Sequence, residues 1–194
     1  MADTKIIRVG LDFDGVVTYN PMRIARLLVS FVKHKIIKVK KLGFFAPKNY
    51  WQKVIFFMAV VIPSLWPANG AALLRKLSKS SEIEFYLITG RYGFVKENTI
   101  SWLKRFRLLD VFKKIFINDD NLQPHEFKMN IIDKQKFDYY IEDNLDVVKF
   151  LYKNCPDIKT LWIYNIVDRN NKYVYKFPDL RRALEKIIED ENIN

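Results

Sequence analysis

Cysteine is nearly absent from this chain of 194 residues, in which Cys155 is the single example. One thiol cannot form a disulfide within the chain, and it cannot supply the several sulfur ligands of a structural zinc or iron–sulfur site. Disulfides are common in secreted proteins and rare in reducing compartments. We therefore expect an intracellular, cytoplasmic protein whose core is large enough to fold without disulfides.

Long apolar runs are also missing. The longest uncharged apolar stretch, residues 54–66, has 13 residues and is interrupted by Pro63. A helix that spans a bilayer needs about 20 apolar residues. The first ten residues are half polar and are soon followed by Asp12 and Asp14, which does not fit a secretion signal. We expect a protein that neither crosses a membrane nor carries a signal peptide.

Acidic residues are missing from one segment. The chain has 33 Lys and Arg against 22 Asp and Glu, a net charge of +11, and is 49% hydrophobic, as in a globular protein. Residues 15–81 contain 12 of the basic residues and no acidic residue, so the rest of the chain is almost neutral. Solvated faces normally mix charges of both signs. The segment therefore indicates an anionic partner.

Short apolar runs predict five buried strands, most of them followed at once by polar residues. These runs are residues 6–12, 83–89, 114–117, 139–141 and 160–164. Helical periodicity separates them, at residues 96–106, 146–152 and 178–190. Alternation of this kind predicts an α/β fold, a Rossmann-like parallel sheet with helices on both faces.

Residues 15–81 interrupt this alternation and are too many for a loop, since structureless loops rarely exceed about 15 residues. Helices are predicted from Asn20–Pro21 onward, over residues 48–62 and over residues 71–78. We interpret residues 15–81 as a small helical cap inserted into a sheet domain that comprises residues 1–14 and 82–194.

The four tryptophans are expected mainly in the core. They are Trp51, Trp66, Trp102 and Trp162. Because Trp51 and Trp66 lie in the predicted cap, they could instead line a substrate entrance.

Three motifs with acidic or hydroxyl side chains lie at the ends of predicted strands. They are residues 12–16 (DFDGV), 89–91 (TGR) and 142–144 (EDN). Open parallel sheets bind ligands beyond the carboxyl ends of their strands. If the three strands are neighbours, carboxylates and a hydroxyl converge there, and such a cluster favours a bound Mg²⁺.

At these residues the sequence resembles the haloacid dehalogenase-like (HAD) superfamily of phosphohydrolases. Residues 12–16 match its first motif, residues 87–90 (LITG) its second and residues 141–144 (IEDN) its fourth. The resemblance covers residues 5–14 and 82–165 and implies a HAD-like core. The predicted cap resembles no family.

The resemblance implies a phosphatase that works through an aspartyl-phosphate. Asp12 is then the nucleophile. Asp14 protonates the leaving oxygen and later activates water, and its presence favours phosphoester hydrolysis because the dehalogenases of the superfamily lack it. Mg²⁺ is held by Asp12, by the main-chain carbonyl of Asp14 and by Asp143.

The second motif supplies the expected phosphate contacts. The resemblance implies that the Thr89 hydroxyl and the Gly90 N–H hold phosphoryl oxygens at the start of a helix. Arg91, the next residue, is counted with Gly90 among the substrate-binding residues.

The third motif of the superfamily is a lysine that neutralises the nucleophile and the phosphate. We assign it to Lys128, which lies 14 residues before the Glu142 of the fourth motif, in a predicted helix. Lys134 and Lys136 are nearer to that strand, and Lys96 is a further candidate, so the assignment stays open among the four.

Three functions remain open. The first is a Mg²⁺-dependent phosphatase acting on a small anionic phosphorylated metabolite, such as a nucleotide. The second is the same enzyme working at an anionic membrane surface, peripheral to the membrane, or at a nucleic-acid end, with residues 15–81 as the docking segment. The third is a non-catalytic HAD-fold binding module. The sequence offers no signal for a stable protein partner.

Overall fold

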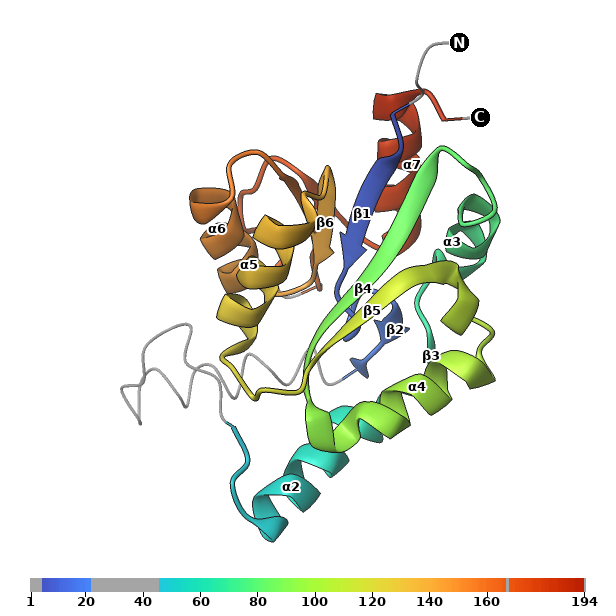
Figure 1. Ribbon diagram of the computed structural model, residues 1–194. Coiled ribbons are helices and arrows are strands. Elements are labelled where there is room, and N and C mark those ends of the chain that lie inside the picture. The colour runs from blue at the N-terminus through green and yellow to red at the C-terminus, as the bar shows by residue number, and fades with distance from the viewer. Residues whose placement is uncertain (1–4, 22–45, 167, 194) are drawn as a thin grey trace.

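A six-stranded parallel sheet forms the centre of the computed structural model, which describes residues 5–21, 46–166 and 168–193 (Figure 1). The strand order is β5–β4–β1–β6–β7–β8, and all of the pairings are parallel. The strands are β1 (Ile7–Leu11), β4 (Ile83–Tyr92), β5 (Phe112–Asn118), β6 (Tyr139–Glu142), β7 (Lys159–Ile163) and β8 (Lys176–Phe177). The predicted α/β fold with a parallel sheet is confirmed.

Strand β1 lies between β4 and β6, and its register sets the position of the motifs. Leu11, the last residue of β1, pairs with Leu87 on one side and with Ile141 on the other. All three side chains are fully buried, as expected for central parallel strands with both faces covered. The residues that follow these three in the sequence therefore lie at one edge of the sheet.

Helices cover both faces of the sheet. On one face lie α3 (Ala71–Leu77), α4 (Lys96–Arg105) and α7 (Leu180–Glu191), whose buried Leu74, Leu103 and Leu184 share a hydrophobic core with β1. On the other face lie α5 (Pro124–Gln135) and α6 (Leu145–Asn154), whose Phe127 and Leu151 belong to a second core. In Figure 1 these two layers flank the strands.

The described part of residues 15–81 divides into two regions. The outer region contains α2 (Tyr50–Phe56), a π-helical turn η2 (Phe57–Val61), and the short antiparallel pair of β2 (Thr18–Tyr19) and β3 (Trp66–Pro67). The inner region is α3, whose Ala71, Leu74 and Leu77 belong to the main core. The boundary expected at residue 81 therefore differs from the packing, because α3 packs with the sheet domain.

The helix predicted over residues 48–62 is present as α2 continued by η2. Asn49 begins it with a capping box: its side chain accepts a hydrogen bond from the Gln52 N–H, and the Gln52 side chain accepts one from the Asn49 N–H. The helix predicted over residues 71–78 is α3. The helix expected from Asn20–Pro21 runs into residues 22–45, outside the described residues.

Two of the four tryptophans pack in or against the core, and two are exposed. Trp162 is fully buried and Trp102 packs against the main core, but Trp51 and Trp66 are exposed on the outer region. The expectation of a core position is wrong for these two. Among the described helices, none combines the length and the apolar character that a bilayer span needs.

Candidate active site

The three motifs meet at the carboxyl edge of the sheet. Asp12 directly follows β1, and its N–H donates to the Ile141 carbonyl of β6 at 2.9 Å. Glu142 ends β6 and Asp143 follows it. Thr89 lies inside β4, which continues to Tyr92, so the expected helix start at Thr89 and Gly90 is wrong: α4 begins only at Lys96.

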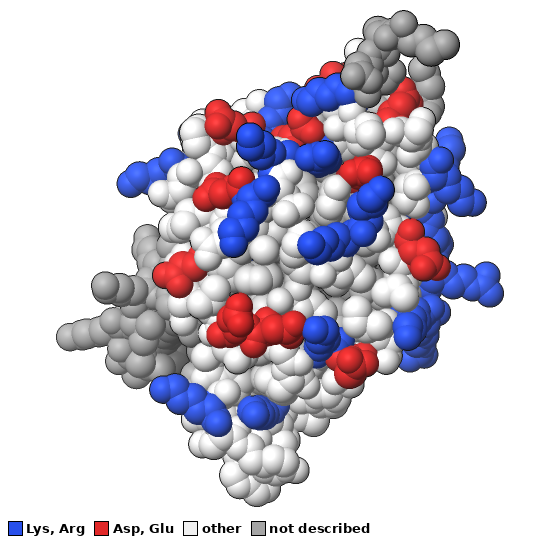
Figure 2. All heavy atoms as spheres, in the orientation of Figure 1, with Lys and Arg blue, Asp and Glu red and all other residues white. Residues whose placement is uncertain are grey.

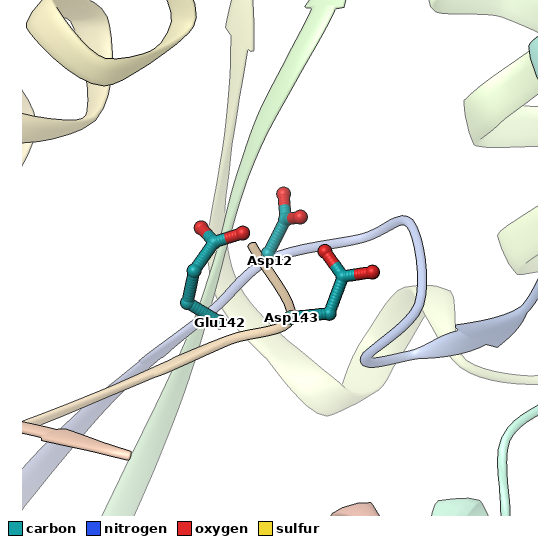
Figure 3. A group of neighbouring side chains, drawn as sticks. All are labelled: Asp12, Glu142 and Asp143. Carbon is teal, nitrogen blue, oxygen red and sulfur yellow. The ribbon is translucent and has the colours of Figure 1, made fainter. Parts of the chain in front are cut away.

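Carboxylates gather at this edge. Oxygens of Asp12, Glu142 and Asp143 lie within 4.8 Å of one another, and all three residues are buried. Figure 3 shows the three side chains converging from the ends of β1 and β6. The pairing of β1 with β6 thus brings Asp12 next to Glu142 and Asp143, which lie more than a hundred residues further along the chain.

Lys128 joins this cluster from α5. Its Nζ lies 2.9 Å from Asp12 Oδ1 and 2.7 Å from Glu142 Oε2, and the lysine is buried. The other candidates lie elsewhere: Lys134 and Lys136 are exposed, and Lys96 pairs with Asp119 at 2.8 Å. Of the four lysines, Lys128 is the one that the structure brings to Asp12.

Glu142 is held by protein groups on both carboxylate oxygens. Oε2 accepts from Lys128 and, at 3.3 Å, from the Tyr140 hydroxyl, while Oε1 accepts from the Asn144 N–H at 3.0 Å. Through the hydrogen bond with Lys128, Glu142 orients the Lys128 side chain. Asp143 is fixed through its main chain, since its carbonyl accepts from the indole N–H of Trp162 at 3.1 Å.

Burial makes the charges of the cluster costly. It raises the pKa of Asp12 well above its usual range, and Glu142 adds to this rise, while Lys128 opposes it. For Lys128 burial alone favours the neutral amine, but the carboxylates of Asp12 and Glu142 outweigh burial and raise its pKa. Lys128 therefore stays charged.

The donor set fits a divalent cation. Three buried carboxyl groups lie within 4.8 Å of one another, and the ammonium group of Lys128 pairs with two of them, so a cation beside them would relieve their mutual repulsion. Oxygen donors of this kind suit Mg²⁺. Because Glu142 is taken up by Lys128, Tyr140 and Asn144, the carboxylates suited to hold the ion are those of Asp12 and Asp143.

Asp14 is bound by Arg91. The Arg91 Nε donates to Asp14 Oδ2 and its Nη2 to Asp14 Oδ1, both at 2.8 Å, which is a bidentate pair. The guanidinium carbon also lies 4.5 Å from the centre of the Phe13 ring. Gly15, with φ of 82°, makes the turn that follows Asp14 in a backbone region that favours glycine.

Arg91 also bonds to the outer region. Its Nη2 donates to the Ser64 hydroxyl at 2.6 Å and to the Val60 carbonyl at 3.2 Å, and Nη1 donates to the Thr99 hydroxyl at 3.3 Å. The Ser64 carbonyl in turn accepts from the indole N–H of Trp102 at 2.6 Å. In this arrangement the guanidinium contacts protein groups, and its role in substrate binding stays a prediction.

Thr89 and Gly90 are constrained by their surroundings. The Thr89 hydroxyl oxygen accepts from the Arg91 N–H at 3.2 Å, and the residue is buried. A Cβ atom at Gly90 would lie 2.8 Å from Pro124 Cβ, so β4 and the start of α5 approach too closely for a side chain. Sequence analysis missed Ser64, because nothing in the local sequence marks it.

No protein-family model and no curated protein matches the sequence. Among solved structures, YfnB of Bacillus subtilis, described as a HAD-hydrolase bound to magnesium, is similar over 97% of this chain and 100% of its own, with a TM-score of 0.59 and 14% identity. CbbY of Rhodobacter sphaeroides in complex with phosphate has a TM-score of 0.59 and 12% identity, covering 93% of this chain and 99% of its own.

A haloacid dehalogenase-like family hydrolase of Streptococcus pneumoniae gives a similar result, with a TM-score of 0.57 and 14% identity over 94% of this chain and 98% of its own. At these identities the likeness concerns the fold. The chain has the HAD fold, as the motifs predict.

Proposed function

We propose that the protein is a Mg²⁺-dependent phosphatase that hydrolyses a phosphomonoester through an aspartyl-phosphate on Asp12. The observation that carries the proposal is the position of Asp12, which directly follows the central strand β1 and lies next to Lys128 and Asp143, with Asp14 two residues further on. The HAD fold of the chain supports the same reading.

The first half of the proposed reaction transfers the phosphoryl group. A carboxylate oxygen of Asp12 attacks phosphorus, the bond from phosphorus to the substrate oxygen breaks, and Asp14 gives a proton to the departing alcohol. Lys128 opposes the rise in the pKa of Asp12, which favours the ionised nucleophile, and offsets the charge of the incoming phosphate. Mg²⁺ bound at Asp12 and Asp143 would supply further charge compensation on the phosphoryl oxygens.

The second half regenerates the enzyme. Asp14 takes a proton from water, the water oxygen attacks phosphorus, and the bond between phosphorus and the Asp12 oxygen breaks, which releases inorganic phosphate. Both Asp14 oxygens accept hydrogen bonds from Arg91 in the described arrangement. Proton transfer at Asp14 therefore requires that at least one of these bonds be released when substrate binds.

The substrate class that we propose is a nucleotide or another small phosphorylated metabolite. The support is the charge of residues 15–81, which contain 12 basic and no acidic residues and would attract an anion. A panel of phosphorylated metabolites, assayed for phosphate release, identifies the preferred substrate.

The decisive experiment replaces the nucleophile. Phosphate release from an aryl phosphate should require Mg²⁺ and should fall by several orders of magnitude in Asp12→Asn. Asp120→Asn is the matched control, since Asp120 is an exposed carboxylate beyond the end of β5 and should retain full activity. Circular dichroism checks that both variants fold.

Turnover by Asp12→Asn at the wild-type rate would refute the assigned nucleophile. Absence of phosphate release by the wild-type protein across the panel, with Mg²⁺ present, would favour the non-catalytic binding module.

A further inference from the structure

Four large apolar side chains form a stripe along the outer side of α2 and η2. They are Trp51, Ile55, Met58 and Ile62, which are 73%, 64%, 58% and 47% exposed. Their spacing of four, three and four residues is that of one face of a helix. We call these four residues the α2–η2 stripe.

The opposite side of the same helix anchors it to the protein. Phe56 packs against the rings of Tyr92 and Phe94, with ring centres 5.5 and 5.4 Å apart. The Val60 carbonyl accepts from Arg91, and Ser64, just beyond η2, bonds to the same guanidinium. The helix is therefore held by its inner side, and within the described residues no packing partner accounts for the apolar side chains on the outer side.

Charge narrows the choice of partner. Within residues 46–66 the charged side chains are Lys48 and Lys53, both exposed, and no acidic residue occurs in residues 15–81. In Figure 2 the lower end of the molecule, where α2 lies in Figure 1, is mostly uncharged, with basic residues beside it and both acidic and basic residues above it. An apolar stripe with the exposed Lys48 at its start and no acidic residue within residues 46–66 complements an anionic apolar interface.

A lipid bilayer with anionic headgroups has both properties. Ile55, Met58 and Ile62 can enter the boundary between headgroups and acyl chains, and tryptophan is enriched at that depth. Lys48 can contact lipid phosphates. Lys53 lies on the inner side of the helix, with its Nζ 5.6 Å from the centre of the Phe94 ring. A nucleic acid would contact Lys48 but would leave the apolar side chains of Ile55, Met58 and Ile62 in water.

We propose that the α2–η2 stripe docks the protein on an anionic membrane surface. Binding of this kind does not depend on turnover, so it can be tested in a protein without activity and stands apart from the proposed phosphatase function.

Vesicle flotation tests the proposal. Asp12→Asn protein should bind vesicles of phosphatidylglycerol and phosphatidylcholine, and should bind pure phosphatidylcholine vesicles much more weakly. The double variant Ile55→Gln and Met58→Gln should lose at least tenfold in affinity, because two inserted side chains become polar. Lys48→Glu should lose about fivefold or more, and added salt should reduce the difference.

A matched control uses exposed apolar residues elsewhere. Ile166 and Val174 are 68% and 79% exposed and lie in the C-terminal half of the sequence, outside residues 15–81. Ile166→Gln with Val174→Gln should bind the anionic vesicles as the parent protein does. Tryptophan fluorescence gives a second readout: vesicles should shift the emission to the blue, and Trp51→Phe should remove most of this shift.

Several results would overturn the proposal. These are no binding to anionic vesicles, equal losses in the stripe variant and in the control, or an unchanged fluorescence shift in Trp51→Phe. Sedimentation that shows a dimer dissociated by the Ile55 and Met58 substitutions, without vesicle binding, would assign the stripe to a second copy of the chain. Binding to single-stranded DNA but not to vesicles would assign it to nucleic acid.

Discussion

Lys128 compensates two buried carboxylates at once, and its removal tests the electrostatics of the site. Lys128→Met should lower the free energy of unfolding at pH 7.5 by about 3–5 kcal/mol, since it leaves Asp12 and Glu142 buried without their partner. The pKa of Asp12 is already raised in the folded protein and should rise further in the variant. Urea unfolding at several pH values measures the effect.

The sign of the pH dependence follows from that shift. A carboxyl group whose pKa is higher in the folded than in the unfolded chain binds its proton preferentially in the folded state. The loss caused by Lys128→Met should therefore shrink as the pH falls through the raised folded pKa. Lys134→Met, an exposed lysine of the same helix, should change stability little at any pH. A loss in Lys128→Met that is constant with pH would contradict the account.

The acid role proposed for Asp14 predicts an effect that depends on the leaving group. Asp14→Asn should lower kcat by about 10²–10⁴-fold with alkyl phosphates, because the departing alcohol is no longer protonated. With a nitrophenyl phosphate, whose leaving group needs no proton, the first half of the reaction should be much less affected. Burst kinetics separate the two halves, and equal losses in the burst for both substrates would argue against an acid role.

The contacts of Lys128 could be predicted in part from the sequence, whereas those of Arg91 could not. Lys128 could be singled out because motif order and helix prediction place it before Glu142, yet only the fold distinguishes it from Lys134 and Lys136. The bond from Arg91 to Ser64 joins residues 27 positions apart and follows from no motif. It depends on how the outer region packs, which local sequence does not encode.

At the scale of elements, α2 and α3 lie close in sequence but differ in burial, because α3 packs into the main core and α2 has no buried residue. Leu74 of α3 is fully buried in the main core, whereas Ile55 of α2 is exposed. Leu74→Ala should lower the free energy of unfolding by about 2–5 kcal/mol through lost burial and the cavity left behind. Ile55→Ala should change it by less than about 0.5 kcal/mol.

Chemical denaturation of both variants measures the difference. A loss of under about 1 kcal/mol for Leu74→Ala would show that α3 belongs with the outer region rather than with the sheet.

The elements differ in how well their sequences reveal them. Strands β1, β4, β6 and β7 are predictable because strands covered on both faces are continuous apolar runs, and the edge strand β5 keeps a short run of this kind. The short strands β2, β3 and β8 have two residues each and carry no such pattern. The exposure of Trp51 is not predictable because an apolar helix face has the same pattern whether it meets a core or an external surface. Trp66 lies in the two-residue strand β3, which is too short to show any pattern.

For the whole molecule, a cation at the carboxyl edge should couple to stability. An ion that binds only the folded chain stabilises it by about 2.7 kcal/mol when present at 100 times its Kd. For a chain of this size that corresponds to a rise in Tm of about 5–10 °C. Mg²⁺ compared with EDTA, at ionic strength matched with KCl, should show this rise in a thermal scan.

Asp143→Asn is the control for that experiment, because Asp143 is one of the two carboxylates suited to hold the ion. The variant should lose most of the Mg²⁺-dependent rise in Tm. A rise that persists in Asp143→Asn, or that KCl reproduces, would place the stabilising ion elsewhere.

The guanidinium of Arg91 makes the outer region and Asp14 share one set of hydrogen-bond donors. Any event that draws Val60 and Ser64 away from this group changes the free energy needed to free Asp14. By thermodynamic linkage the dependence is reciprocal: a ligand that withdraws Asp14 from Arg91 changes, by the same free energy, how readily the α2–η2 helix shifts. Through the Arg91 side chain, ligand binding at the carboxyl edge of the sheet and the position of the outer helix are therefore thermodynamically coupled.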